Sequence, residues 1–293
     1  MPKNSLMPGE GLDARKMPGH WLLARLGKRV LRPGGLELTH RLLAALDIQS
    51  GDSVVEFAPG LGVTARLTLN QHPASYTAIE RDELAAGNLR ILLKGARQKC
   101  LMGSAENTGL PASTATVVYG EAMLTMQGLS QKQQIVREAF RLLQPGGRYG
   151  IHEMCFVPGN LDEDIKNAVE KGLSEVIHVG ARPMTVKEWC ALLEAEGFRV
   201  EHEATTPMHL LEPIRLVHDE GIFGAARFIW NLLHDKNARA RVVAMRKLFK
   251  KHEAHIAAVM LVAVKPKISP ITDDSVDSSR LCACSQPILS TTA

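Results

Sequence analysis

The sequence predicts an α/β fold in which a largely parallel sheet is covered by helices on both faces. Two observations lead to this prediction. Between Ser53 and Cys155, short apolar segments of strand length alternate with helical segments, and such alternation is typical of a parallel, doubly wound sheet. After Cys155 the rhythm changes, and two final strands, residues 198–204 and 256–264, are expected to pair antiparallel at the sheet edge.

The parallel core is predicted from five strands and three helices. The expected strands span residues 53–57, 76–80, 99–103, 115–119 and 148–155, and the expected helices span residues 61–71, 82–94 and 129–143. The last helix is amphipathic, with Ile135, Ala139 and Leu142 at helical spacing. The breaker Pro145-Gly146-Gly147 should end it before the fifth strand.

Further helices are expected on either side of this core. They span residues 21–31, 36–46, 161–176 and 185–196, and a helical insertion spans residues 210–252. We expect one domain over residues 20–266, in which the insertion forms a cap over the substrate. Residues 1–19 are expected to be a flexible N-terminus. Residues 267–293, rich in Ser, Thr, Asp and Pro, should form a disordered tail.

Composition limits the classes of function and partner. The chain has 293 residues, a net charge of +4 and 4% aromatic residues, which argues against a protein that stacks nucleic-acid bases. Five cysteines without compact spacing favour a reducing compartment over a disulfide scaffold. The N-terminus lacks the apolar core of a signal peptide, and no apolar run approaches the roughly 20 residues of a membrane-spanning helix. We therefore expect a soluble, cytoplasmic protein.

The segment Glu56-Phe57-Ala58-Pro59-Gly60-Leu61-Gly62 has the features of a nucleotide-binding loop. It joins a strand to a helix, and its glycines let the backbone turn sharply and approach a ligand closely. The helix that follows presents free N–H groups at its start. Glu80 comes 18 residues after Gly62, at the end of the next strand, where a carboxylate can accept both ribose hydroxyls. This pattern alone supports NAD and S-adenosylmethionine equally.

Three features favour S-adenosylmethionine. Glu56 lies four residues before Gly60, where a carboxylate would repel a pyrophosphate but suits the ammonium group of a methionine moiety. About fifty residues precede the first strand, whereas a dehydrogenase domain usually opens with it. The antiparallel final strands also differ from a second mononucleotide-binding half. The remaining interpretation is a turn that merely connects strand to helix.

At this point the sequence resembles the class I methyltransferases, and in particular the group similar to ubiquinone/menaquinone-biosynthesis methyltransferases. The resemblance covers residues 53–155. Its motifs are Val55 to Gly62, Ile79-Glu80, the segment Gly103 to Pro111, and the segment Glu138 to Arg148. It implies a Rossmann-like seven-stranded sheet with the last strand antiparallel, and S-adenosyl-L-methionine bound across the carboxyl ends of the strands.

The resemblance also implies roles for residues around the cofactor. The turn from Ala58 to Gly62 would hold the methionine end and Glu80 the ribose. The family often has Asp where Ser104 stands, so the adenine amino group could bind either Ser104 or Glu106. The expected cofactor-binding residues are Glu56, Ala58, Pro59, Gly60, Gly62, Glu80, Arg81, Ser104, Ala105, Glu106 and Tyr119.

Three residues are candidates for catalysis. Methyl transfer from a sulfonium is an in-line displacement that depends mainly on alignment and on excluding water. Glu121 follows the fourth strand and would serve either as a base or as a cofactor contact. His152, late in the fifth strand, is either a half-buried strand residue whose hydrogen bonds are all made within the protein, or a base. His20 would close over the site if the N-terminus formed a lid.

Other segments have two or more interpretations. The segment Arg32-Pro33-Gly34-Gly35 is interpreted as a break between two helices, and the alternative is that Arg32 or the Gly34 and Gly35 backbone contacts the cofactor carboxylate. Apolar side chains of the insertion would pack on the core or line a substrate pocket; they are Ile222, Phe223, Ala226, Ile229, Trp230 and Leu233. Its basic residues are read as a solvated helix face, or alternatively as a peripheral membrane contact.

The expected reaction is transfer of a methyl group to a small-molecule acceptor, either lipophilic and quinone-like or a small nucleophile such as a thiol. An NAD(P)-dependent oxidoreductase and a non-catalytic module that binds S-adenosylmethionine or RNA are the alternatives. Nucleic acid is not expected as a partner. No metal site is expected, because Cys282-Ala-Cys284 is too short and isolated for zinc.

Overall fold

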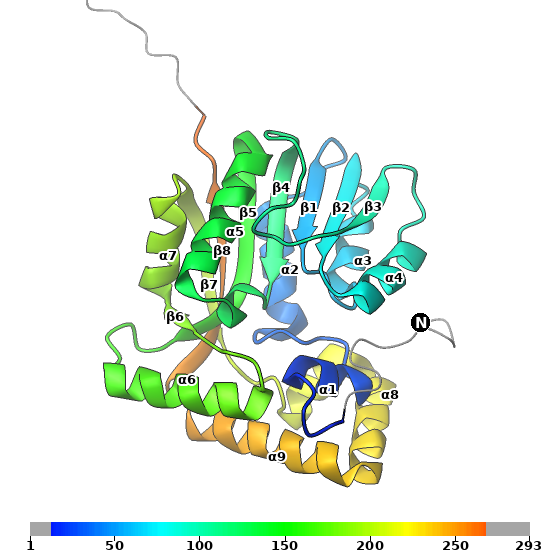
Figure 1. Ribbon diagram of the computed structural model, residues 1–293, viewed down its shortest axis with the longest axis vertical. Helices are drawn as coiled ribbons and strands as arrows, with labels where there is room; N and C mark the ends of the chain where they lie inside the picture. Colours follow the sequence, from blue (N-terminus) through cyan, green and yellow to red (C-terminus); the bar gives the residue numbers. More distant parts are fainter. Residues whose placement is uncertain (1–12, 268–293) are drawn as a thin grey trace, which may run out of the picture.

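The computed structural model describes residues 13–267, which are built around one mixed sheet of eight strands (Figure 1). The strands are β1 (Ser53–Phe57), β2 (Ser75–Glu80), β3 (Gln98–Met102), β4 (Ala115–Glu121), β5 (Leu143–Phe156), β6 (Met184–Thr185), β7 (Arg199–Pro207) and β8 (Ile256–Val264). Their order is β3-β2-β1-β4-β5-β8-β7, and β6 pairs with β5. The first five strands are parallel, whereas β8 is antiparallel to both β5 and β7.

The predicted fold class is therefore confirmed. The parallel core and the antiparallel final strands form as expected, with Phe57 of β1 beside Gly120 of β4. The sheet has eight strands rather than seven, because the two residues of β6 pair with Cys155 and Phe156 at the end of β5. The carboxyl ends of β1, β2 and β4 meet at one edge, which is where open parallel sheets bind ligands.

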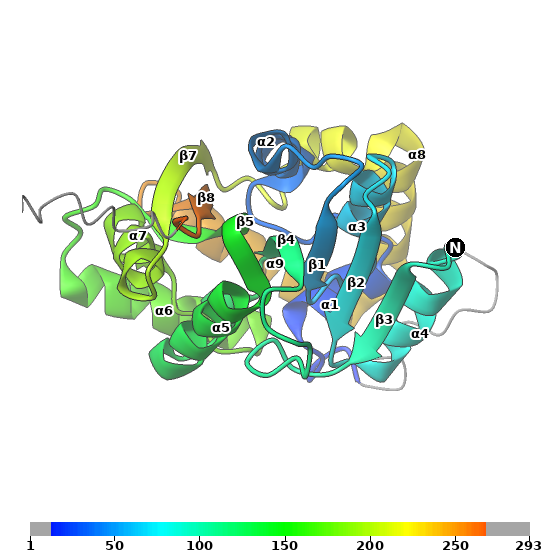
Figure 2. The same cartoon turned by 90° about the horizontal axis from the view of Figure 1, so that it is seen from above.

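Helices cover both faces of the sheet (Figure 2). They are α1 (Gly19–Arg25), α2 (Gly35–Leu46), α3 (Val63–Leu69), α4 (Glu83–Leu92), α5 (Leu129–Leu142), α6 (Glu163–Ile177), α7 (Val186–Ala195), α8 (Pro213–His234) and α9 (Lys236–Lys251), with a short 3-10 turn η1 (Leu124–Met126). Leu38 of α2, Ala65 of α3 and Leu89 of α4 share one buried cluster. Ile135 of α5 and Trp189 of α7 belong to the cluster on the other face.

A third buried cluster joins four helices beyond the carboxyl ends of the parallel strands. It includes Leu22 of α1, Val169 of α6, Phe228 of α8 and Met245 of α9, together with Phe156 at the end of β5. These helices form the lower layer of the molecule in Figure 1. A helical layer thus lies opposite the sheet edge that carries the glycine loop.

Two predicted boundaries were wrong for local backbone reasons. The first helix was expected over residues 21–31 but ends at Arg25, because Gly27 adopts a φ of 103° that a helix cannot continue through. The chain then runs as an irregular segment to α2. The breaker Pro145-Gly146-Gly147 was expected to separate helix from strand but lies within β5, which begins at Leu143. The bulge between Ala115 and Val117 accommodates this extension.

The helical insertion consists of α8 and α9, and its apolar residues do not lie where the sequence suggested. They were expected in the core or in a substrate pocket, but all six side chains are exposed; they are Ile222, Phe223, Ala226, Ile229, Trp230 and Leu233. The reason is a break in α8 at Gly221, whose φ is 73° and ψ is 167°. After this break Ala225 and Phe228 become the buried residues of the helix.

The described part of the predicted flexible N-terminus is packed. Ala14 and Met17 are buried, and the Arg241 guanidinium donates hydrogen bonds of 2.6 Å to each of their carbonyl oxygens. Residues 1–12 and 268–293, which include most of the predicted tail and both Cys282 and Cys284, lie outside the described residues. Within residues 13–267, no helix has the length and apolar character needed to span a membrane.

Candidate active site

A cavity of about 600 Å³ lies between the glycine-loop edge of the sheet and the helical layer. Its sheet side is lined by Glu56, Ala58, Pro59, Gly60, Glu80, Arg81, Ser104, Ala105, Glu106 and Glu121. Its helical side is lined by His20, Trp21, Leu23, Ile177, Val179, Met208, Leu210, Met245 and Phe249. Of the predicted cofactor-binding residues, Gly62 and Tyr119 are the two outside this lining. The structure therefore gathers residues from several strand ends around one space.

The two glycines of the loop have different structural tasks. Gly62 has a φ of 69°, and a Cβ there would lie 2.9 Å from Leu89 Cδ2, so it allows α3 to pack closely against α4. Gly60 has a φ of 53°, and a Cβ there would approach no atom closer than Trp21 Cη2 at 3.9 Å. A side chain at Gly60 would therefore project into the cavity, whereas one at Gly62 would push two helices apart.

The Glu80 carboxylate fixes the position of the glycine loop. Its Oε2 accepts a hydrogen bond of 3.0 Å from the Gly60 N–H, and its Oε1 accepts bonds of 2.9 Å from the Arg81 and Asp82 N–H groups. Burial raises the pKa of Glu80, while the three backbone donors oppose that rise. The side chain thus holds the loop to the end of β2 and lines the cavity at the same time.

Glu56 lies on the cavity wall with two tyrosines behind it. Tyr119 donates a hydrogen bond of 2.6 Å to Oε2 of Glu56, and Tyr76 donates another to the same oxygen. Burial raises the pKa of Glu56 to about 7, although both phenols oppose the rise. Tyr119 was expected among the residues around the cofactor. Instead it is fully buried, and its hydroxyl lies between Glu56 and Thr68, so it positions Glu56 rather than lining the cavity.

Glu121 is the centre of a buried polar network. The Arg32 guanidinium lies 2.7 Å from Oε2 of Glu121, and Thr64 also donates to that oxygen. Thr39 and His152 Nδ1 contact Oε1 at 2.6 Å and 2.8 Å. Burial alone would raise the pKa of Glu121, but the Arg32 charge and these hydrogen bonds together lower it to about 2. Glu121 is therefore a fixed anion at neutral pH and a weak proton acceptor.

His152 is held at both ring nitrogens. The Gly34 N–H donates a hydrogen bond of 3.0 Å to its Nε2, so the ring proton must be on Nδ1, where it is donated to Glu121. The side chain is fully buried and is absent from the cavity lining. His152 was expected to be either a hydrogen-bonded strand residue or a base, and this arrangement fits the hydrogen-bonded strand residue.

Arg32 was expected mainly to mark the break between two helices, but it has a larger structural role. It is buried and lines the cavity. Its hydrogen bonds to Thr39, Thr64 and Glu121 all use Nη1, so its other nitrogens are free to face a ligand. The two threonines were missed from the sequence, where neither lies in a recognisable motif for this contact.

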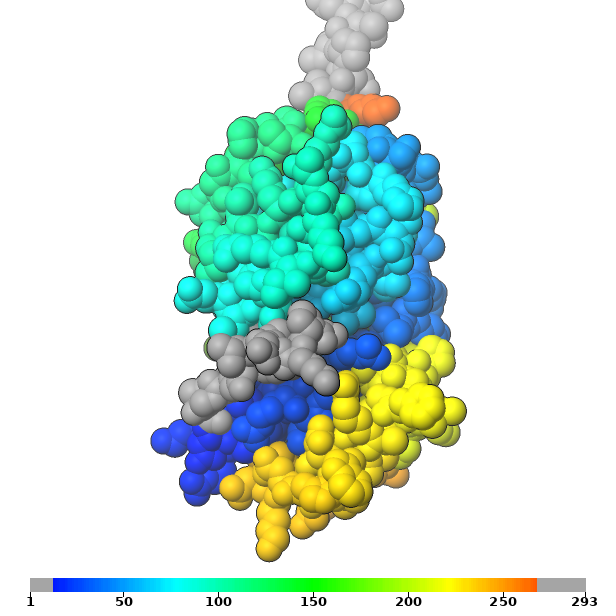
Figure 3. All heavy atoms as spheres, turned by 90° about the vertical axis from the view of Figure 1, so that its right-hand side faces the viewer, coloured from blue at the N-terminus to red at the C-terminus, as the bar shows by residue number. Residues whose placement is uncertain are grey.

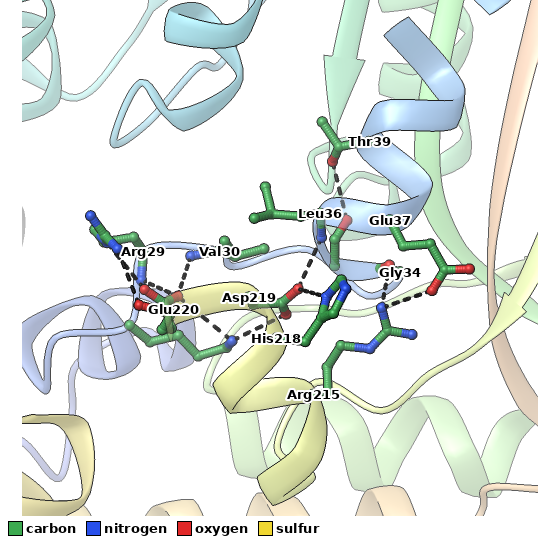
Figure 4. Close-up of polar contacts among 12 residues, drawn as sticks. Arg29, Val30, Gly34, Leu36, Glu37, Thr39, Arg215, His218, Asp219 and Glu220 are labelled. Atoms are coloured by element: carbon green, nitrogen blue, oxygen red, sulfur yellow. Dashed lines mark hydrogen bonds and ion pairs between the residues drawn. The ribbon is translucent and has the colours of Figure 1, made fainter. Parts of the chain in front are cut away.

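The segment that carries Arg32 is anchored by the first half of α8 (Figure 4). Glu220 accepts hydrogen bonds of 2.7 Å and 2.8 Å from the Arg29 and Val30 N–H groups, and Asp219 accepts one of 3.0 Å from the Leu36 N–H. Lys28, also fully buried, places its Nζ 3.6 Å from Asp219 and 3.8 Å from Glu220. Sequence reasoning missed this cluster. The adjacent acidic pair Asp219-Glu220, the only carboxylates within α8, was the available signal.

His20 lies in the cavity at the start of α1. Its ring is 4.7 Å from that of Trp21. Burial, followed by the nearby Arg81 charge, lowers the pKa of His20 to about 4, so the imidazole is neutral at physiological pH. The position is where an N-terminal lid would place it. Its catalytic role remains a prediction.

The remaining candidates are distributed as follows. Ser104, Ala105 and Glu106 follow β3 and all line the cavity, so both candidate partners for the adenine amino group stay in place. The described cysteines lie on separate elements, with Cys100 on β3, Cys155 on β5 and Cys190 on α7. No cluster of three or more metal-ligating side chains occurs within residues 13–267.

Comparisons with known proteins agree with this geometry. A family model described as a methyltransferase domain matches residues 55–151. An uncharacterized protein of Haemophilus influenzae is 33% identical over 252 residues, which are 84% of this chain and 98% of that protein. The 27-O-demethylrifamycin SV methyltransferase of Amycolatopsis mediterranei is 25% identical over 235 residues, covering 78% of this chain and 83% of that enzyme.

Among solved structures, a phosphoethanolamine N-methyltransferase 2 from Haemonchus contortus, in complex with S-adenosylhomocysteine, superposes with a TM-score of 0.64. It shares 16% sequence identity, and the match covers 85% of this chain and 58% of that one. At this level of identity the similarity concerns the fold.

Proposed function

The chain belongs to the class I S-adenosylmethionine-dependent methyltransferases, and on this premise we propose that its methyl acceptor is a lipophilic small molecule. The observation that carries the proposal is the apolar character of the helical side of the cavity, which includes Leu23, Ile177, Val179, Met208, Leu210, Met245 and Phe249, together with the adjoining Met126 and Met154. An acceptor with an apolar body would remove this surface from water. A small thiol would leave most of it hydrated, which favours the lipophilic acceptor of the two alternatives.

In this proposal, residues 20–266 form one catalytic domain, and α9 provides the cap. Met245 and Phe249 of α9 line the cavity from the helical side, whereas α8 contributes no side chain to the lining. The acceptor would therefore lie between α9 and the strand ends. The proposed cap is smaller than the whole insertion that the sequence suggested.

The sheet side of the cavity fits S-adenosylmethionine. The Gly60 backbone leaves the space that a Cβ would occupy, and the buried Glu56 carboxylate reaches the cavity wall next to it. We assign Glu56 to the ammonium group and Arg32 to the carboxylate of the methionine moiety, since opposite charges stabilise each other strongly in a buried site. Glu80 is assigned to the ribose, and Ser104 or Glu106 to the adenine amino group.

The bound cofactor supplies a methyl group activated by a sulfonium, and the residues of this chain provide alignment and a dry environment. Glu121 and His152 are both engaged in hydrogen bonds and are poor candidates for a base. The acceptor should therefore be a group that loses its proton readily, such as a phenolic or enolic hydroxyl. Its oxygen would form the bond to the methyl carbon as the carbon–sulfur bond breaks, and the proton would leave to solvent, because the lowered pKa of His20 makes its imidazole a weak proton acceptor.

The proposal is tested by measuring adenosylhomocysteine release with a panel of acceptors and two variants. Met245→Trp should fill the acceptor side of the cavity and lower kcat/KM for an apolar phenol at least about tenfold, while the cofactor Kd stays unchanged. Val243→Trp is the matched control, since Val243 lies on the same helix and is 44% exposed. Faster turnover of a small hydrophilic thiol than of any apolar acceptor, or equal effects of the two variants, would contradict the proposal.

A further inference from the structure

The second half of α8 presents an apolar face to solvent. Its members are Ile222 (74% exposed), Phe223 (92%), Ile229 (47%), Trp230 (64%) and Leu233 (57%), and we refer to them as the α8 face. All five recur at intervals that place them on one broad side of a helix. Ala225 and Phe228 occupy the opposite side and are buried in the core of the helical layer.

This face is unusual for the surface of a single soluble domain. Isolated exposed hydrophobic residues are normal, whereas a contiguous group of large ones marks an interaction site. The space-filling view in Figure 3 shows α8, in yellow, on the outer surface of the helical layer. None of the α8 face lines the active-site cavity, so its exposure is not explained by substrate binding.

Positive charge is concentrated in the same part of the chain. Residues 213–251 contain nine arginines and lysines but three carboxylates, whereas the remainder of the chain has a small net negative charge. Asp219 and Glu220 are buried beside Lys28, and Asp235 pairs with Arg25 at 2.9 Å. The exposed basic side chains are Arg227, Lys236, Arg246, Lys247, Lys250 and Lys251, of which Arg246 pairs with Glu212 at 3.1 Å. Helices α8 and α9 therefore carry an excess of positive charge on their exposed sides.

We propose that the α8 face docks this protein on an anionic lipid surface. Exposed Phe, Trp, Ile and Leu side chains bordered by lysine and arginine are the combination by which an interfacial helix enters the headgroup region. The lysines of α9 would contact lipid phosphates. A second copy of this chain fits less well, because a symmetric contact through this face would bring two cationic surfaces together.

This docking would also orient the active site. The inner side of α9 lines the cavity through Met245 and Phe249, while its outer side carries Lys247 and Lys250. A bilayer held against these helices would thus lie next to the wall of the acceptor cavity. The docking itself does not depend on which acceptor is methylated, since it involves residues outside the cavity.

The experiment is flotation of the full-length protein with vesicles. Vesicles of phosphatidylcholine mixed with phosphatidylglycerol should bind it, whereas phosphatidylcholine alone should not. Phe223→Ser with Trp230→Ser should weaken binding at least about tenfold. Lys247→Gln with Lys250→Gln should weaken it about fivefold per charge and reduce its sensitivity to salt. Leu129→Ser and Lys187→Gln, at exposed positions on α5 and α7, are the controls and should bind as the unaltered protein does.

Three results would overturn the proposal. The first is equal binding to both kinds of vesicle, or no binding to either kind. The second is unchanged binding by the Phe223/Trp230 variant and by a second pair on the same face, Ile222→Ser with Leu233→Ser. The third is a stable dimer in sedimentation that these serine variants dissociate, since the occupant of the face would then be a second copy. Methyl transfer to a water-soluble acceptor, measured without lipid, should be unaffected by the serine substitutions, so failure here leaves the proposed function untouched.

Discussion

Tyr119 donates a hydrogen bond of 2.6 Å to Oε2 of Glu56, from the side opposite the cavity. Because Tyr76 donates to the same oxygen, the carboxylate is held in place before any ligand arrives. Burial of this group is nevertheless costly for its charged form, and its pKa is raised to about 7. The ionisation of Glu56 should therefore depend on ordinary changes in pH.

Cofactor affinity should rise with pH through this range. If Glu56 binds the ammonium group of S-adenosylmethionine, the ionised form is the one that binds tightly. Since its pKa lies near 7, the ionised fraction increases about tenfold between about pH 6 and about pH 8, and the association constant should increase by a similar factor. The assignment is checked by calorimetric titration with S-adenosylmethionine across this pH range. The variant is Glu56→Gln, and Glu83→Gln, at an exposed position, is the control. A steep profile that survives in Glu56→Gln would exclude Glu56 as its source.

The same group should make stability depend on pH. In the folded chain the pKa of Glu56 is raised from 4.5 to about 7, so folding favours the protonated carboxyl. This contribution is fully present below about pH 4.5 and is lost as pH rises through about 7, which amounts to about 3 kcal/mol. Urea unfolding of the cofactor-free chain should show a smaller decrease over this interval in Glu56→Gln than in the unaltered protein. An identical pH dependence of the two would contradict this account.

Much of the fold was predictable because its signals are local. The strand Ile256–Val264 was predicted at its observed ends, since a continuous apolar run identifies a buried strand without reference to its neighbours. The glycine loop was equally visible, because its function needs particular residues side by side. What escaped prediction depends on distant partners. Arg32 and Glu121 are 89 positions apart, and no local pattern indicates that they meet.

The α8 face illustrates the same limit. Helical spacing correctly grouped Ile222, Ile229 and Leu233 on one side of a helix. It could not show that this side points outward, because that depends on how the break at Gly221 turns the helix. Spacing determines which residues share a face, and tertiary packing determines what the face contacts.

The loop assignments predict losses of cofactor affinity without loss of the fold. Gly60→Val would place a β-branched residue at a φ of 53° and project methyl groups into the cavity, so the Kd for S-adenosylmethionine should rise at least about a hundredfold. Glu80→Gln keeps the shape but weakens the bonds to the Gly60 and Arg81 N–H groups, and about a tenfold rise is expected. Gly51→Ala, at a position with no atom within 4 Å, is the control. Normal affinity in Gly60→Val would show that the cofactor binds elsewhere.

Glu121 should behave as a positioning residue for Arg32. Replacing it with Gln removes the anion that faces Nη1 of Arg32, and the loss of a charged hydrogen bond should raise the cofactor Kd about tenfold. At saturating cofactor, kcat should fall little and its pH profile should keep its shape, because a carboxyl with a pKa of about 2 is already ionised throughout. Glu121→Asp should restore part of the affinity. If kcat instead fell by several orders of magnitude with the Kd unchanged, Glu121 would be the base.

The buried pair of Lys28 and Asp219 should stabilise the segment that carries Arg32. Lys28 Nζ is 3.6 Å from Asp219 Oδ2, and both side chains are fully buried. Lys28→Met leaves two buried carboxylates without this cation, which should lower the free energy of unfolding by about 3 kcal/mol or more. Asp219→Asn in the same background removes one of these two charges and keeps an acceptor for the Leu36 N–H, so the double variant should be more stable than Lys28→Met alone.

Urea unfolding and cofactor titration of the single and double variants would test this coupling. The recovery in stability should be accompanied by a recovery in cofactor affinity, because the segment from Arg29 to Leu36 is tied to α8 through this cluster. Strictly additive effects of the two substitutions would mean that the charges do not interact. A recovered stability with cofactor affinity still lost would instead show that Lys28 acts on the site by a route other than anchoring this segment.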